Sequence, residues 1–167
     1  MQSDIRHWLG LWDYLDGNFW GFWQWALDHL TPEQVGWQPL PQVASVGWNL
    51  QHLGEMLDHY LARVFNQVNH VQGGPLLTMR AGSQDDGCYM DLQGIAAYHR
   101  QLRPAYRAFL SKLSLGDLDR VIERTNRRTI TYGWCVGHIA EHESYHLGKC
   151  VLLRTLIMGG MRYRERR

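Results

Sequence analysis

The chain has 167 residues, a length at which one domain can bury a core of its own. Hydrophobic residues make up 45% and charged residues 20%, which excludes an intrinsically disordered protein. The formal net charge of +1 gives no reason to expect a nucleic-acid partner. We therefore expect residues 1–167 to form a single domain.

Targeting signals and a disulfide framework are not indicated. The segment Met1–Arg6 contains an acid and lacks the apolar region of a signal peptide. No uninterrupted apolar run approaches the length of about 18 residues that suggests a membrane span. The three cysteines are an odd number without close spacing, which favours reduced thiols. We expect a cytoplasmic protein with no membrane partner.

The first predicted helix extends from Asp4 to about Leu30, where apolar residues recur near a period of 3.6. Five of the eight tryptophans lie in it: Trp8, Trp12, Trp20, Trp23 and Trp25. An aromatic stripe can line a substrate pocket, but aromatic residues at helical spacing are more often buried. We expect this stripe to belong to the core.

Ser45 is a good N-cap for a second helix, which the apolar pattern extends to about Val68. This helix carries His52 and His59, which are seven residues apart, so either side chain could face the interior of a bundle. Residues 66–90 are rich in glycine and other turn formers, which predicts a long loop. We favour an ordinary exposed loop over a lid.

Asp91 can cap a third helix that extends to about Leu113, although Pro104 inside it predicts a kink or a break. A short hairpin is predicted next, between Val121–Arg124 and Arg128–Thr131.

The fourth helix begins near Thr131 and runs to about Met158. Together the pattern predicts an all-α protein, an up-and-down-type four-helix bundle with a long loop between its second and third helices.

His138, His142 and His146 follow one another at four-residue spacing in the fourth helix. They fall within roughly 80° of one helix face, and each lies about 6 Å further along the axis than the last. Neighbours can therefore bind one ion. All three cannot, because about 12 Å of helix rise separates His138 from His146, whereas each ligating imidazole nitrogen must lie about 2.0–2.1 Å from zinc. The usable pair is His138/His142 or His142/His146, and further ligands must come from elsewhere.

A lone histidine on an apolar face is usually a hydrogen-bonded core residue, and this is our interpretation of His99. Three histidines on one face are different, because burying such a polar stripe is costly unless it is satisfied. Metal binding is therefore favoured for them. Cys135 lies three residues before His138, so a Cys135/His138/His142 group is also open.

Residues 142–146 also satisfy H-E-x-x-H, the pattern in which two histidines bind zinc and the glutamate is a general base. This makes Glu143 the candidate catalytic base, although it is offset by about 60° around the helix from His146. Zinc proteases of this kind take a third ligand downstream of the motif. After His146 this chain has no histidine, and its only acidic residue is Glu165. A zinc metalloprotease is therefore the less favoured function.

Four segments carry a further resemblance: Leu30–Gln34, Ser45–Glu55, Thr129–Trp134 and His138–Lys149. In them the sequence resembles the DinB/YfiT-like superfamily of metal-binding four-helix bundles. The resemblance implies a metal site of His52, His142 and His146, occupied by zinc, nickel or a similar divalent ion with open positions. It places Lys149 where the family commonly has glutamine. His138 precedes the pair by one turn, a position from which we expect it to orient a ligand or line the pocket.

Relatives implied by this resemblance include transferases and isomerases that use small thiols such as bacillithiol or mycothiol. We expect a metal-dependent enzyme of the thiol S-transferase or hydrolase kind, acting on a small molecule. The alternative is a non-catalytic metal-binding or stress-response protein. A homodimer is a further option.

Overall fold

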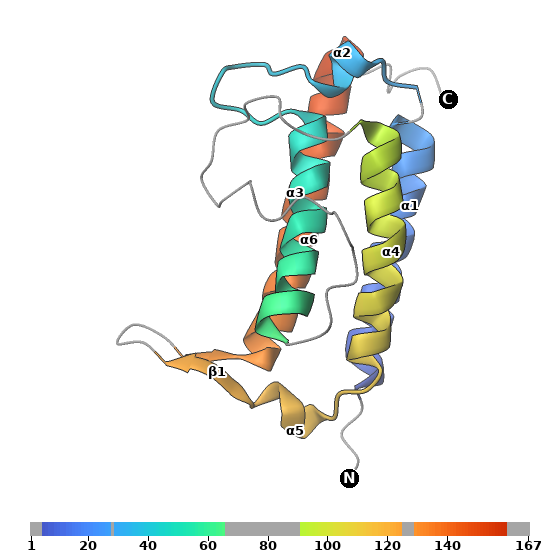
Figure 1. Cartoon of the computed structure of the whole chain (residues 1–167). Helices are drawn as coiled ribbons and strands as arrows, with labels where there is room; N and C mark the ends of the chain where they lie inside the picture. The colour runs from blue at the N-terminus through green and yellow to red at the C-terminus, as the bar shows by residue number, and fades with distance from the viewer. Residues whose placement is uncertain (1–4, 28, 66–90, 125–128, 160–167) are drawn as a thin grey trace, which may run out of the picture.

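The computed structural model describes residues 5–27, 29–65, 91–124 and 129–159, and its long helices stand side by side as an all-α bundle (Figure 1). These helices are α1 (Arg6–Phe22), extended by the π-helical turn η1 (Trp23–Leu27); α3 (Val46–His59), extended by η2 (Tyr60–Val64); α4 (Leu92–Leu110); and α6 (Tyr132–Ile157). The predicted four-helix bundle is confirmed. Helices α1 and α6 run in one direction and α3 and α4 in the other (Figure 1). The consecutive helices α3 and α4 are therefore parallel, so the bundle departs from the predicted up-and-down alternation; two parallel neighbours in sequence need a long crossover connection between them.

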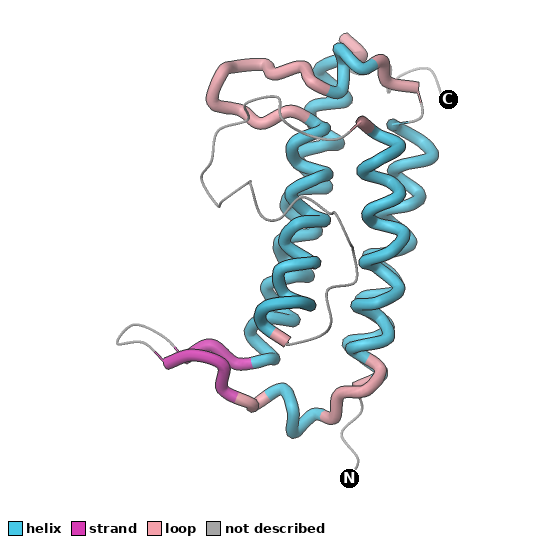
Figure 2. The backbone as a smooth tube through the Cα atoms, in the orientation of Figure 1, coloured by secondary structure: helices cyan, strands magenta, loops and turns pink. Residues whose placement is uncertain are grey.

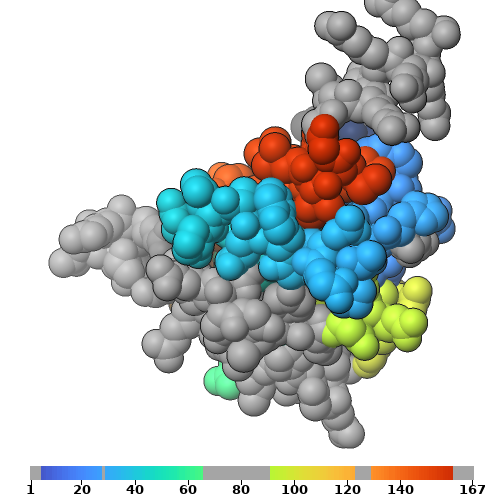
Figure 3. All heavy atoms as spheres, turned by 90° about the horizontal axis from the view of Figure 1, so that it is seen from above, coloured from blue at the N-terminus to red at the C-terminus, as the bar shows by residue number. Residues whose placement is uncertain are grey.

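Short elements close the two ends of the bundle. One end carries α2 (Pro32–Val35), and the other carries α5 (Leu115–Leu118) and a hairpin of β1 (Val121–Arg124) and β2 (Thr129–Thr131) (Figure 2). The strands are antiparallel, with Val121 opposite Thr131. This confirms the predicted hairpin, whereas the predicted 66–90 loop lies outside the described residues. Seen from above, the segment around α2 and the start of α3 lies against the end of α6 (Figure 3).

The helix starts follow from capping side chains. Ser45 accepts a hydrogen bond from the backbone N–H of Trp48 at 3.2 Å, and Asp91 accepts one from Gly94 at 2.6 Å. Each satisfies a backbone donor that the first turn of a helix leaves unpaired. Both predicted N-caps are therefore confirmed.

Helix α4 continues through Pro104 to Leu110 without the break that this proline suggested. Pro104 lies on the exposed side of the helix. A proline removes one backbone hydrogen bond, and on the solvent side the carbonyl that loses its partner can be hydrated.

Most of the aromatic stripe of the first helix belongs to the core, as predicted, although Trp25 is 56% exposed. Its buried aromatic residues are Trp12, Phe19, Phe22 and Trp23. They contribute to two apolar clusters, one toward each end of the bundle. None of the helices in the described part of the chain is long and apolar enough to cross a membrane.

Helices α3 and α4 approach each other closely at Gly54. A Cβ atom at this position would lie 2.7 Å from the ring of Tyr98 and 3.3 Å from Nε2 of His99. Tyr98 donates its hydroxyl proton to Asp58 at 2.9 Å, and His99 bonds the carbonyl of Leu50 at 2.9 Å. These buried contacts fix α3 against α4, and they confirm that His99 is a hydrogen-bonded core residue.

Candidate metal centre

Helices α3 and α6 pack against each other and bring three histidines together. His52 comes from α3, and His142 and His146 come from successive turns of α6. Each offers a ring nitrogen within 4.8 Å of the other two. Among the described residues, no other group of three histidine, cysteine or carboxylate side chains meets this criterion.

The spacing of these nitrogens suits a single ion. Nε2 of His52 lies 3.2 Å from Nε2 of His142. Two imidazole nitrogens bound to one tetrahedral zinc ion are separated by about 3.3 Å, because each lies about 2.0–2.1 Å from the metal. The ring of His146 is centred 4.3 Å from that of His142 and 4.9 Å from that of His52. The donor set and its geometry therefore fit a divalent ion such as zinc.

Asn49 fixes the tautomer of His146. Its amide nitrogen donates to the carbonyls of Ala44 at 3.1 Å and Ser45 at 2.7 Å. The amide oxygen consequently faces His146, whose Nδ1 lies 2.7 Å away and must carry the proton of this hydrogen bond. Nε2 of His146 is then left with the lone pair that a metal ion needs.

Sequence reasoning missed Asn49. It precedes His52 by three residues and so lies on the same face of α3. That spacing was the signal that could have revealed it.

Replacing Asn49 by alanine is expected to weaken zinc binding by about 10–100-fold, because partners that orient a ligating histidine contribute about that much to affinity. Competition with a chromophoric chelator measures the change. Gln51→Ala is the control, since Gln51 is another buried amide of α3 but bonds Glu55. Equal zinc affinities for the two variants would refute this role of Asn49.

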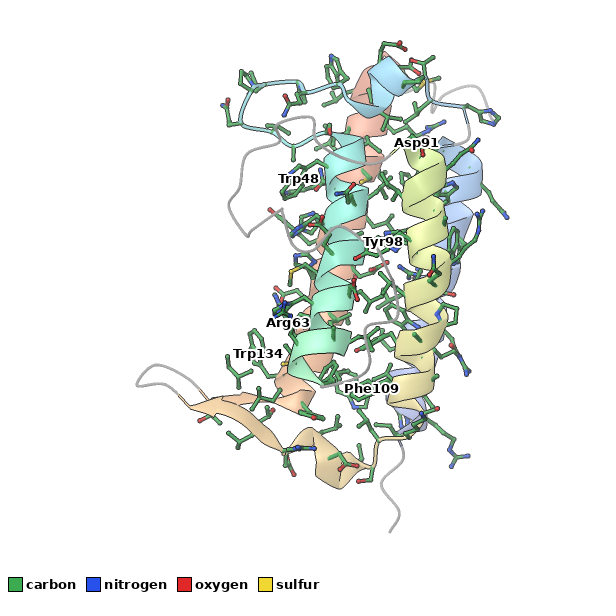
Figure 4. All side chains as sticks on the ribbon, viewed as in Figure 1. Trp48, Arg63, Asp91, Tyr98, Phe109 and Trp134 are labelled. Atoms are coloured by element: carbon green, nitrogen blue, oxygen red, sulfur yellow. The ribbon has the colours of Figure 1, made fainter. Side chains whose placement is uncertain are left out.

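Trp48 covers one side of the histidine group. Its ring stacks on that of His52, with centroids 4.6 Å apart and planes 22° apart. Trp48 is buried and lies, like Trp134, on the side of the bundle away from α4 (Figure 4). The indole thus holds the imidazole of His52 in one orientation and excludes water from one face of the site.

The environment keeps the α6 histidines neutral. Burial, together with the neighbouring histidines and Lys149, lowers the pKa of His142 to about 4 and that of His146 to about 3. A neutral imidazole is the form that binds a metal ion. The two side chains are therefore ready to act as ligands at neutral pH.

His138 lies beside the group rather than in it. Its ring stacks on Trp134 with centroids 4.9 Å apart, and it is centred 5.6 Å from the ring of His142. Its Nδ1 lies 3.7 Å from a carboxylate oxygen of Glu141. Of the two pairs that the spacing left open, the structure joins His142/His146 with His52.

Cys135 is part of the core. It is buried in the apolar cluster that contains Tyr106, and burial raises the pKa of its thiol to about 11. A neutral thiol in such surroundings is a poor ligand. The Cys135/His138/His142 group is not formed among the described residues.

Glu143 points to α4 instead of the histidines. Its carboxylate accepts a hydrogen bond at 2.7 Å from Nη1 of Arg103, and Nε of the same guanidinium pairs with Asp16 of α1. Burial raises the pKa of Glu143, and the charge of Arg103 opposes this shift. The guanidinium lies 4.0 Å from the centre of the Phe19 ring. This network links α1, α4 and α6, and no sequence pattern indicated that Arg103 and Asp16 belong to it.

Comparison with known proteins identifies the family. The family model of the DinB superfamily matches residues 20–150. The chain belongs to the DinB superfamily. The resemblance found in the sequence is thereby confirmed, and the matched range contains His52, His142 and His146.

Solved structures agree with this assignment at the level of the fold. This chain is similar to a conserved protein from Enterococcus faecalis whose crystal structure is known, with 16% sequence identity and a TM-score of 0.75. The match covers 95% of this chain and 99% of that one. No curated protein matches the sequence.

Proposed function

We propose that this DinB superfamily protein is a metal-dependent enzyme whose divalent ion, zinc or nickel, is held by His52, His142 and His146. The convergence of their three ring nitrogens carries the proposal. Zinc and nickel both accept imidazole ligands. Three ligands leave at least one position of a tetrahedral ion open, which distinguishes a catalytic site from a closed structural one.

Thiol S-transfer is the reaction that the side chains support best. A divalent ion held by three neutral ligands keeps its charge and lowers the pKa of a thiol or water that binds it. Among the described residues the ligand group contains no carboxylate, and the carboxylate of Glu143 is hydrogen-bonded to Arg103. The described part of the site therefore offers no free carboxylate base. Transfer from a thiol needs no protein base: sulfur bonds to an electrophilic carbon, the leaving group departs with its electron pair, and the thiol proton goes to solvent.

Hydrolysis is the second candidate, and one observation favours it. A cavity of about 10 Å³ between α3 and α6 is lined by both His142 and Glu143, and about this volume accommodates one water molecule. In a hydrolase Glu143 would act as the base, as the sequence pattern predicted, after its carboxylate leaves Arg103.

Small thiols test the proposal directly. The cobalt-loaded protein is titrated with bacillithiol, mycothiol, glutathione and cysteine while its visible spectrum is recorded, and conjugation to a chlorinated dinitrobenzene is then measured. We expect at least one thiol to change the spectrum and react, and His146→Ala to abolish both effects. His29→Ala, which alters an exposed histidine, serves as the control. If no thiol changes the spectrum, the transferase proposal fails, and hydrolysis or a non-catalytic metal site takes its place.

Proteolysis is not expected despite the H-E-x-x-H match. The proposed third ligand is the upstream His52, and the described part of the chain has only the short hairpin as a sheet. Casein should therefore remain intact when incubated with the zinc-loaded protein. Cleavage that a chelator stops would contradict this expectation.

A further inference from the structure

Lys149 is a cation beside the metal centre. It follows His142 by seven residues, so both lie on nearly the same face of α6. Its Nζ lies 4.2 Å from the centre of the Tyr145 ring, which in turn packs edge-on against His146 at 5.1 Å. The side chain thus reaches back along the helix to the level of the ligands, and its charge is felt by both histidines.

This ammonium group has no counter-charge in the described part of the chain. No carboxylate there lies within 4.0 Å of it, and Glu141, two turns earlier on α6, lies near His138 instead. The Tyr145 ring supplies a weak cation–π contact and is itself 58% exposed. A half-buried cation next to an exposed ring attracts an anion more strongly than a solvated one does, because less water screens the charge.

We propose that Lys149 is a specificity-determining residue that binds a carboxylate of the small molecule whose reacting group enters the metal centre. This rests on the proposed function and specifies its substrate class, a small thiol that also carries a carboxylate. The histidine group receives one end of the molecule and Lys149 the other, while the Tyr145 ring provides a flat apolar surface between them.

Two thiols of equal size test this assignment. The cobalt-loaded full chain is titrated with mercaptopropionate and with its uncharged amide, and the dissociation constant of each is taken from the visible spectrum. We expect mercaptopropionate to bind about fivefold more tightly than its amide, or better, because a hydrogen bond to a charged group contributes about this much to affinity. Lys149→Met should bring the ratio of the two constants to about one, and Lys149→Arg should preserve the preference.

Arg154→Met is the matched control. Arg154 is also a half-buried cation of α6 over an aromatic ring, 4.0 Å from the centre of Trp25, but it lies on another face of the helix. This variant should keep the preference for the carboxylate. An unchanged ratio in Lys149→Met overturns the role of Lys149 and leaves thiol binding intact. If neither thiol alters the spectrum of any variant, thiol binding fails and the role of Lys149 fails with it.

Discussion

Replacing both His142 and His146 by alanine is expected to abolish metal binding. His52, the one member of the ligand group that remains, cannot hold a divalent ion against competing water and buffer, because affinity depends on several ligands acting together. Elemental analysis of purified protein should give about one divalent ion per chain for the wild type and none for the double variant.

His138→Ala is the control for this result. Its ring stacks on Trp134 and lies outside the ligand group, so this variant should keep its metal. Full occupancy in the double variant would show that the ion is bound elsewhere. Loss of metal from His138→Ala alone would show that the ligand pair is misassigned.

Replacing Arg103 by methionine is expected to destabilise the fold by about 3 kcal/mol, because removing one partner of a buried ion pair leaves the other buried without compensation. The side chain of Arg103 is 1% exposed and that of its partner Glu143 is 4% exposed. Denaturant unfolding followed by circular dichroism measures the loss.

Arg107→Met is the matched control, one turn further along α4. Arg107 also pairs with an aspartate of α1, Asp13, but both side chains are about half exposed. Exposed ion pairs add little to stability, so this variant should unfold close to the wild type. If Arg103→Met lost no more stability than Arg107→Met, the network would not hold the helices together.

The fold was predictable because its signals are local. Apolar periodicity located the long helices, and Ser45 and Asp91 marked the starts of two of them. Helix continuity at Pro104 was not predictable, since it depends on which side of α4 faces solvent. That side is decided by packing against other helices.

The metal centre was predictable only in part. Four-residue spacing restricts the pair to neighbours but does not choose between His138 and His146, which are equivalent about His142. The choice depends on where α3 places His52, a tertiary contact. Asn49 and Arg103 were missed for the same reason, because a polar side chain shows its role only through its partner.

Glu143 illustrates how a motif can mislead about direction. Successive helical residues point about 100° apart, so Glu143 faces α4 when His142 faces α3. In the structure it meets Arg103 of α4. Its assignment as a general base remains a prediction.

The extended X-ray absorption fine structure of the bound metal tests the three-histidine centre most directly. For the zinc-loaded protein we predict a first shell of nitrogen or oxygen atoms at about 2.0–2.1 Å, with the scattering pattern of three imidazole rings. Cys135 and Cys150 are both buried and free, so neither should contribute. A sulfur ligand at about 2.3 Å, or the signature of fewer than three imidazoles, would contradict the assignment of His52, His142 and His146 as the ligands.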